Sequence, residues 1–357
     1  MRLRSTIAPA LAFLLVACSG SPGASSPAAS LPAASVPAAS VPAASAPASS
    51  GAASKFKLGI TIYPPVVSVV ASAVNAATAE AKAKGIEAVF AFAEDAAKQQ
   101  SAVESLISQG IDVLAIDPND STAIGTAVKL ANDANIPVIM WIGKTESGTV
   151  ATSILSPDEK SSAALSTHIF KDVMGGSGDV AFIQGNQVHA AFIAREKGMR
   201  DTLTQFPNVK LVAFGIGNET ADKANPVALD MITKNPNLKA IYADSDAMAD
   251  GAYSAVESSG KTDQISVFGY NGSCPTLNSI WNGKIKGTLY QGWSGFGANV
   301  VQVAEKVFNK ETVPEVIENP AYVIDKAAME KVQAGTFVPD DPTLKVSVME
   351  AISNTCP

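Results

Sequence analysis

Two polar clusters, each placed directly after an apolar run, are the residues whose types and spacing suggest chemistry in this sequence. The first is Asp117-Pro118-Asn119-Asp120, and the second is Asp244-Ser245-Asp246. In both copies a helix-length segment follows and leads to another apolar run that ends in an aromatic residue, Trp141 or Tyr270. Carboxylates, amides and hydroxyls at strand ends exchange hydrogen bonds with small polar ligands. The repeat therefore predicts two similar open sheets whose polar loops face each other across a ligand-binding cleft.

Motifs typical of catalysis are missing or misplaced. Two histidines and three cysteines are too few for a zinc or iron–sulfur site with several such ligands. The glycine-rich stretch Gly176–Ala181 precedes a predicted strand, whereas a dinucleotide fingerprint follows one. Gly292-Trp293-Ser294-Gly295 lacks the spacing of a nucleophile elbow, and there is no P-loop. We therefore expect a binding protein without cofactor or metal rather than an enzyme.

Length and composition indicate a globular protein of about two domains. The 357 residues exceed the roughly 250–300 that a single core supports. Apolar residues make up 47% of the chain and charged residues 17%. The formal net charge is −7 and lysine and arginine form no large cluster, so nucleic acid is not an expected partner.

The N-terminus has the layout of a bacterial secretory signal. Arg2 and Arg4 precede an apolar run over residues 7–17, shorter than the ~20 residues that span a bilayer. The run ends in Leu15-Val16-Ala17-Cys18, which resembles the lipobox, where the peptide is cut before a diacylated cysteine. We expect residues 1–17 to be a signal peptide and Cys18 to anchor an extracytoplasmic protein to the membrane. A plain signal peptide with an incidental cysteine is the alternative.

Residues 18–54 have the composition of a tether. Proline recurs every fifth residue from Pro22 to Pro47 among alanine and serine, and no charge occurs between Arg4 and Lys55. Such a segment has no apolar periodicity to bury and is expected to be extended or disordered. It would reach about 110 Å as a polyproline helix or roughly 35 Å as a flexible coil, and either length would hold a domain away from a membrane. A glycosylated stalk without a spacing role is the alternative.

From Lys55 onward, short apolar runs alternate with amphipathic segments of helical length. This alternation is typical of a parallel sheet covered by helices on both faces. The predicted strands are 57–62, 87–91, 113–116, 138–141, 180–184, 210–214, 240–243, 265–270 and 286–291. The predicted helices include 69–84, 96–109, 122–134 and 189–206.

Several motifs occur in a characteristic order. They are Ile116–Ser121, Asn135–Ile139, Arg195–Met199, Asp244–Ala249, Val267–Gly272 and Gly287–Gln291. In this order they resemble the ribose-binding branch of the type I periplasmic binding proteins, and the resemblance covers residues 55–310. It implies an α/β fold of two Rossmann-like lobes with parallel sheets, hinged by three crossover segments. It also implies a receptor that delivers a solute to the permease of an ABC importer.

The resemblance places the crossovers near Ser156, Gln291 and Tyr322. Lobe 1 would comprise residues 55–156 and 292–322, and lobe 2 residues 157–291 and 323–357. Hinge closure of the two lobes would trap the ligand, and a monomer would present the closed form to the importer. Repressors of the same fold carry a DNA-binding helix-turn-helix where this chain has its signal peptide. A receptor that presents a signal molecule to a membrane sensor is the alternative.

By the same resemblance, the sugar contacts of the family fall on Asp117, Arg195, Glu219, Ser245, Asn271 and Gln291. Arginine can donate two parallel hydrogen bonds to neighbouring oxygens, and each side-chain amide offers both a donor and an acceptor to hydroxyls. Structural roles are the alternatives at several of these positions. Asp117 could cap a helix, Arg195 could be a surface charge, and Ser245 and Asn271 could be turn residues.

The first lobe departs from the family pattern. Relatives in the family usually have an Asp-Arg pair that binds the sugar ring oxygens, and this chain has Ile142-Gly143 at that place. They also have an aromatic pair after the first strand, where this chain has Tyr63-Pro64-Pro65-Val66-Val67. Further candidate contacts are therefore taken from neighbouring strand ends, helix starts and crossovers: Tyr63, Trp141, Lys144, His189 and Trp293. The expected ligand is polyhydroxylated: an unusual sugar, a sugar alcohol, a furanose-like signal molecule or an acidic derivative held by Lys144.

Cys274 and Cys356 remain once Cys18 carries lipid. In an oxidising compartment two remaining cysteines usually pair. A bridge would contribute roughly 4 kcal/mol on the chain-entropy model and would hold the C-terminal tail beside Asn271. Two free thiols are the alternative.

Overall fold

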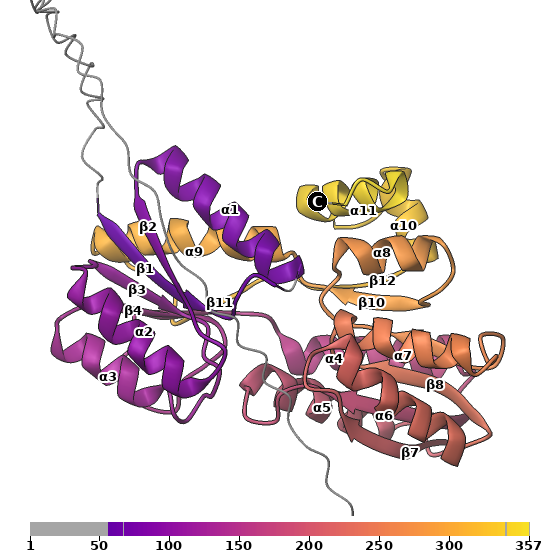
Figure 1. The fold of residues 1–357 in the computed structure, drawn as a ribbon. Helices are drawn as coiled ribbons and strands as arrows, with labels where there is room; N and C mark the ends of the chain where they lie inside the picture. The colour runs from indigo at the N-terminus through magenta and orange to yellow at the C-terminus, as the bar shows by residue number, and fades with distance from the viewer. Residues whose placement is uncertain (1–55, 67, 340, 357) are drawn as a thin grey trace, which may run out of the picture. The chain divides into compact units, whose positions relative to one another are not determined.

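The computed structural model describes residues 56–66, 68–339 and 341–356. The predicted signal peptide, the lipidation of Cys18 and the tether lie outside these residues. No helix within the described ranges is long and apolar enough to cross a membrane. This part of the chain forms two α/β lobes, each built on one six-stranded sheet (Figure 1). The predicted fold class is confirmed.

The first lobe has a parallel sheet in the order β11-β5-β4-β3-β1-β2. Its strands are β1 (Lys57–Ile62), β2 (Glu87–Phe92), β3 (Val113–Ile116), β4 (Val138–Ile142), β5 (Thr152–Leu155) and β11 (Val316–Glu318). Helices α1 (Ser68–Lys84) and α9 (Trp293–Phe308) share one hydrophobic core with the sheet, and α2 (Ala96–Ser108) and α3 (Gly125–Asp133) share a second one. Figure 1 shows these two pairs on opposite faces of the sheet.

The second lobe has the sheet order β12-β10-β9-β8-β6-β7, in which only β12 pairs antiparallel among the described strands. The strands are β6 (Gly178–Gln184), β7 (Val209–Ile216), β8 (Leu238–Ala243), β9 (Ser266–Phe268), β10 (Gly287–Tyr290) and β12 (Tyr322–Asp325). The helical elements are α4 (Asp158–Thr167), the π-helix η1 (His168–Val173), α5 (Ala190–Leu203), α6 (Ala221–Lys234), α7 (Asp246–Ser258), α8 (Cys274–Trp281), α10 (Lys326–Gln333) and α11 (Pro342–Ser353).

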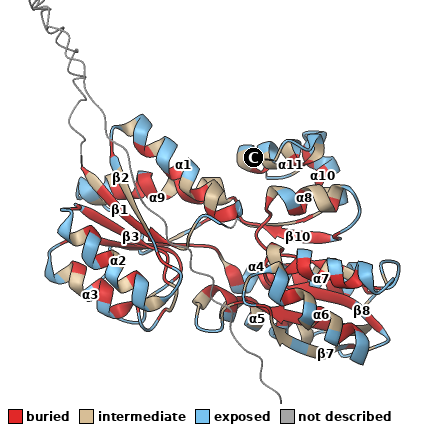
Figure 2. Cartoon of the chain, viewed as in Figure 1, coloured by how far each residue is buried: buried red, intermediate tan, exposed pale blue. Residues whose placement is uncertain are grey.

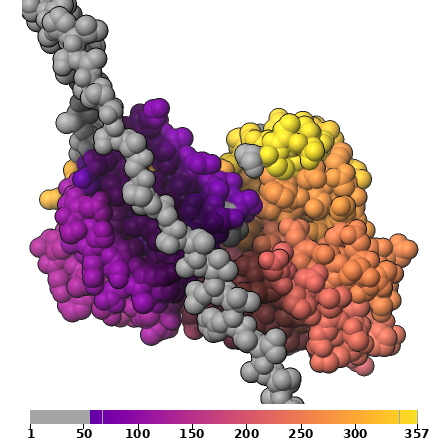
Figure 3. Space-filling model, viewed as in Figure 1, coloured from indigo at the N-terminus to yellow at the C-terminus, as the bar shows by residue number. Residues whose placement is uncertain are grey.

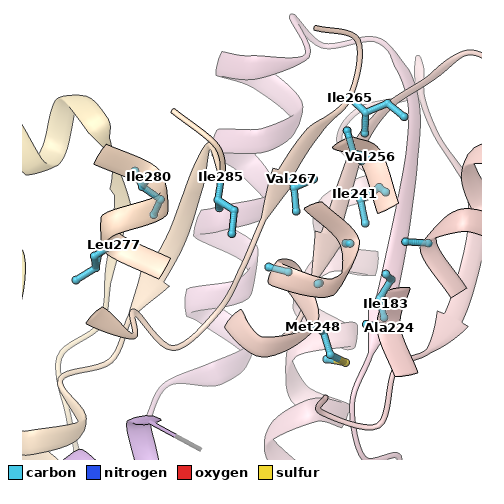
Figure 4. Packing of buried hydrophobic residues seen from close by; sticks show 14 of the residues in the cluster. Ile183, Ala224, Ile241, Met248, Val256, Ile265, Val267, Leu277, Ile280 and Ile285 are labelled. Atoms are coloured by element: carbon cyan, nitrogen blue, oxygen red, sulfur yellow. The ribbon is translucent and has the colours of Figure 1, made fainter. Parts of the chain in front are cut away.

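Continuous apolar strands explain why the two sheets are covered on both faces. Every residue of β3 and β4 is buried, as are the last four residues of β8. Figure 2 shows inner strands such as β3 and β8 buried, whereas the edge strands β2 and β7 are only partly buried and the helices have both buried and exposed sides. In the second lobe Ile241 and Val267 pack against Met248 and Val256 of α7 (Figure 4). Such two-sided burial is the property of parallel sheets that makes their strands recognisable as apolar runs.

The chain passes between the two sheets three times. The connections lie between β5 and α4, between β10 and α9, and between β11 and β12. Tyr322 was expected to close lobe 1, but it pairs with Tyr290 of β10 and therefore belongs to the second sheet. The short strands β5, β11 and β12 were not predicted, because three or four residues carry no clear apolar period. The helices α10 and α11 were not among the named predictions either.

Candidate ligand-binding site

A cavity of about 650 Å³ lies where the strand-end loops of the two sheets meet. Its walls include eight of the predicted contacts: Tyr63, Asp117, His189, Arg195, Glu219, Ser245, Asn271 and Trp293. They come together because the carboxyl ends of parallel strands, and the helix starts that follow them, share one edge of each sheet. The volume is suited to a small molecule.

Arg195 of α5 is a buried, positively charged residue on the cavity wall, and only 2% of its surface is exposed. Its Nε donates to Asp158 Oδ1 at 2.8 Å, and its Nη1 donates to the backbone carbonyl of Asp244 at 2.8 Å. The ring of Tyr270 lies 3.9 Å from the guanidinium carbon. Burial alone would lower the pKa of Arg195, but Asp158 together with Tyr270 and Asp244 outweighs burial and raises it. Arg195 therefore remains charged and is held in one orientation.

Close packing of α4 on α5 makes this ion pair possible. Asp158 lies in the first turn of α4, and Arg195 and Gly198 lie on α5. A Cβ added to Gly198 would lie 2.2 Å from the carbonyl oxygen of Glu159, so a larger residue would push the two helices apart. The Asp158 side chain also accepts hydrogen bonds from the hydroxyl of Tyr270 at 3.0 Å and from Nε2 of Gln291 at 3.3 Å.

His189 and Asp117 join the strand-end loops of the two lobes. Nδ1 of His189 accepts the backbone N–H of Ala191 at the start of α5, which leaves Nε2 to face Asp117 Oδ1 at 3.4 Å. Burial would lower the pKa of His189, but Asp117 outweighs burial and raises it, while burial raises the pKa of Asp117 itself. Asn186 adds a second link between the loops, because its Nδ2 donates to the carbonyl of Asn119 at 3.2 Å.

Glu219 is a half-buried carboxylate with an unusual backbone. It has φ +64°, and the preceding Asn218 has φ +44°, a region that residues other than glycine seldom occupy. Burial raises the pKa of Glu219, although His189 and Arg195 lower it in part. Strained positions of this kind are often found at functional sites.

Asn271 and Ser245 occupy two neighbouring strand ends of the second lobe. Asn271 is 8% exposed, has φ +121°, and its Oδ1 has no hydrogen-bond partner among the described residues. Ser245 Oγ accepts the backbone N–H of Met248 and caps α7, so this hydroxyl has the structural role considered as an alternative while also lying on the cavity wall.

Three predicted contacts lie off the cavity wall. Trp141 is 0% exposed and packs in the core between the first sheet and helices α1 and α9. Successive residues of a strand point to opposite sides, so the next residue, Ile142, lines the cavity instead. Lys144 is exposed beyond the end of β4. Gln291 lies behind Arg195, whose Nη2 donates to its Oε1 at 3.4 Å.

Several residues that shape the site were not among the predicted contacts, although Asp246 belongs to the second polar cluster of the sequence. Asp158 neutralises Arg195 from behind the wall, and Asn186, Phe192 and Asp246 line the cavity. Asp246 accepts hydrogen bonds from Ser273 N and Thr288 Oγ1, both at 2.6 Å, and burial raises its pKa to about 7. Asp158 follows Ser156-Pro157 at a crossover, a position that could have drawn attention to it.

Cys274 and Cys356 form a disulfide beside this wall, with 5.5 Å between their Cα atoms. Cys274 begins α8, and its neighbours Ser273 and Pro275 line the cavity. Helix α11 packs on α8, and Figure 3 shows the yellow C-terminal residues against orange residues of the same lobe. The bridge therefore connects the C-terminal segment to one side of the site.

Two α/β lobes that enclose a small cavity with fixed polar groups and aromatic rings define a two-lobed binding protein for a small polar molecule. The part of the chain that the structure describes contains no cluster of three histidine, cysteine or acidic residues placed to hold a metal ion. The model of the periplasmic binding protein domain matches residues 62–312, and the chain belongs to this family. The resemblance inferred from the sequence motifs is confirmed.

Relatives of this chain are named as sugar- or polyol-binding proteins. The ribose import binding protein of Bacillus subtilis is 32% identical over 242 residues, which are 68% of this chain and 78% of the relative. The xylitol-binding protein of Mycolicibacterium smegmatis is 27% identical over 75% of this chain and 76% of its own length. The structure of an ABC transporter periplasmic solute binding protein from Actinobacillus succinogenes with bound D-allose has a TM-score of 0.73 and 25% identity, and covers 76% of this chain and 98% of that one. These relatives are binding proteins rather than enzymes.

Proposed function

We propose that this protein is the solute receptor of an ABC importer and captures a sugar or sugar alcohol between its two lobes. The observation that carries the proposal is the rigid cation Arg195 on the wall of a cavity shared by both lobes, in a chain similar to ribose and xylitol receptors. A buried guanidinium that is already oriented can donate to ligand oxygens with little further loss of entropy.

We assign the ligand contacts by position and chemistry. Arg195 and Asn271 would supply hydrogen bonds from the second lobe, and Asp117 would accept them from the first lobe. Tyr63 and Trp293 would present aromatic faces to the C–H groups of the ligand. Gln291 and Asp158 would position Arg195 rather than touch the ligand.

Secretion and membrane attachment complete the proposal. Cleavage before Cys18 and its lipidation would anchor the protein on the outer side of the bacterial membrane, and the Pro/Ala/Ser tether would let it reach the permease as a monomer. Presentation of a signal molecule to a membrane sensor is less favoured, because the relatives include import binding proteins by name.

A thermal-shift screen of the full chain tests the proposal. Pentoses, hexoses, polyols and inositols would each be added, and a ligand at 100 times its dissociation constant should stabilise the fold by ~2.7 kcal/mol. Asn271→Ala should abolish the shift, whereas Asn208→Ala, at an exposed position outside the cavity, should retain it. A screen in which no sugar or polyol raises the melting temperature would contradict the proposal.

A further inference from the structure

The cavity wall is rich in carboxylates and poor in free cations. Five acidic residues line it: Glu94, Asp117, Glu219, Asp246 and Asp250. Of the basic residues that line it, Arg195 is already paired with Asp158, His189 is paired with Asp117, and Lys223 is exposed. A ligand that enters this cavity therefore meets a negative potential, which opposes a carboxylate and favours a positive group.

Glu219 is the carboxylate that a positive group would meet. Within the described residues, no lysine, arginine or histidine nitrogen forms an ion pair with it, whereas Glu94 pairs with Lys98 and Asp117 pairs with His189. His189 and Arg195 are near enough to lower the pKa of Glu219, but each is paired with another carboxylate, so an ammonium group of a ligand would pair with Glu219 directly. Glu219 lines the cavity and has a left-handed backbone.

Two independent features of the wall suit the same ligand. Asn271 Oδ1 is a buried acceptor that lacks a donor among the described residues, and an N–H or O–H group of a ligand would satisfy it. Tyr63 and Trp293 add aromatic faces to the cavity. Burial and the nearby carboxylate of Glu219 raise the pKa of Tyr63. Aromatic rings beside a carboxylate are an environment that attracts ammonium groups.

We infer that the preferred ligand is a polyol bearing a protonated amine, such as an amino sugar or amino sugar alcohol, with its ammonium group at Glu219. The inference rests on the proposed function and narrows its ligand class. It also excludes the acidic derivative considered from the sequence, because Lys144 does not line the cavity.

Matched ligand sets test the inference. Each set keeps one carbon skeleton and changes one group: sorbitol, 1-amino-1-deoxysorbitol and gluconate, and glucose, glucosamine and glucuronate. Calorimetric titration of the full chain should give tighter binding of the amine than of the neutral member, by about 10-fold or more, and weaker binding of the acid. N-acetylglucosamine, which lacks the charge, should lose the advantage of glucosamine.

The variant Glu219→Gln should remove the preference for the amine and leave binding of the neutral member within about threefold. Glu330→Gln, at an exposed position of the same lobe, is the matched control and should change neither. An amine that binds no tighter than its neutral counterpart overturns the inference but leaves the proposed function intact. Binding of no member of either set, together with a negative sugar and polyol screen, overturns both. Should Glu219→Gln fail to fold, the wild-type comparison alone still decides.

Discussion

The guanidinium of Arg195 and the carboxylate of Asp158 are joined by a hydrogen bond of 2.8 Å between Nε and Oδ1, and both side chains are almost fully buried. Asp158 begins the helix after the first crossover, and Gln291, which contacts both residues, lies at the second. The cation on the cavity wall is thus attached to two of the three connections between lobes. If Arg195 binds the ligand as proposed, the ligand would contact a hydrogen-bonded network that includes residues at these two connections.

Breaking this pair should destabilise the fold strongly. Asp158→Ala leaves the buried guanidinium of Arg195 without its counterion, and we expect the free energy of unfolding to fall by ~3–5 kcal/mol. Urea denaturation measures the change. Asp201→Ala removes an exposed partner of Lys197 and should scarcely move the unfolding midpoint. Equal effects of the two variants would show that the buried pair has no special weight.

Arg195→Lys should separate ligand binding from folding. Lysine keeps the charge but lacks the planar fork that contacts Asp158, Asp244 and Gln291, so the affinity for the ligand should fall by about 10-fold or more. Arg200→Lys, on the exposed side of the same helix, is the control for helix stability. An unchanged dissociation constant in the first variant would argue against Arg195 as a contact.

Stability should depend on pH through His189. Its pKa is raised in the folded protein because Asp117 outweighs burial, with Glu219 adding to the shift and Arg195 opposing it. The contribution of His189 is therefore full below its ordinary pKa of about 6.5 and is lost as the pH rises through the higher folded value. His189→Asn should lower the melting temperature more at about pH 6 than at about pH 9. In an Asp117→Asn background this pH dependence should largely disappear; if it persists, another partner holds the imidazolium.

Removal of the disulfide should weaken the second lobe. The bridge joins residues separated by 82 positions, and its loss through Cys356→Ser should reduce stability by roughly 4 kcal/mol on the chain-entropy model. The double variant with Cys274→Ser should behave like the single one. A thiol assay of the unfolded, unreduced protein should detect no thiol at these two positions, and two titrating thiols would contradict the pairing.

Trp141 and Trp293 should have opposite phenotypes. Trp141→Ala removes a large core side chain and should cost about 3–5 kcal/mol of stability, as other large-to-small core substitutions do. Trp141→Phe is milder and should leave ligand affinity unchanged. Trp293→Ala should lower the affinity with a smaller effect on unfolding, because Trp293 lines the cavity and is only partly buried. A loss of ligand affinity in Trp141→Phe would indicate that Trp141 contacts the ligand after all.

The sequence by itself determined the two α/β lobes, most strand positions and the polar strand ends. Continuous apolar runs such as 113–116 and 138–141 are readable because a strand buried on both faces must be apolar throughout. The polar turns at Asp117, after 113–116, and at Ser245, after 240–243, were recognised as a candidate site because ligands of such sheets bind at the carboxyl ends of the strands.

Only the tertiary structure decided which polar residues meet. Asp158, Arg195 and Gln291 are far apart in the chain, and their contact depends on the close packing of α4 on α5 and on the path of the second crossover. Nor does local sequence reveal that Trp141 points into the core, since strand register alone sets the side of each residue. Local patterns encode burial and turns, whereas long-range contacts depend on how the packed elements are arranged in three dimensions.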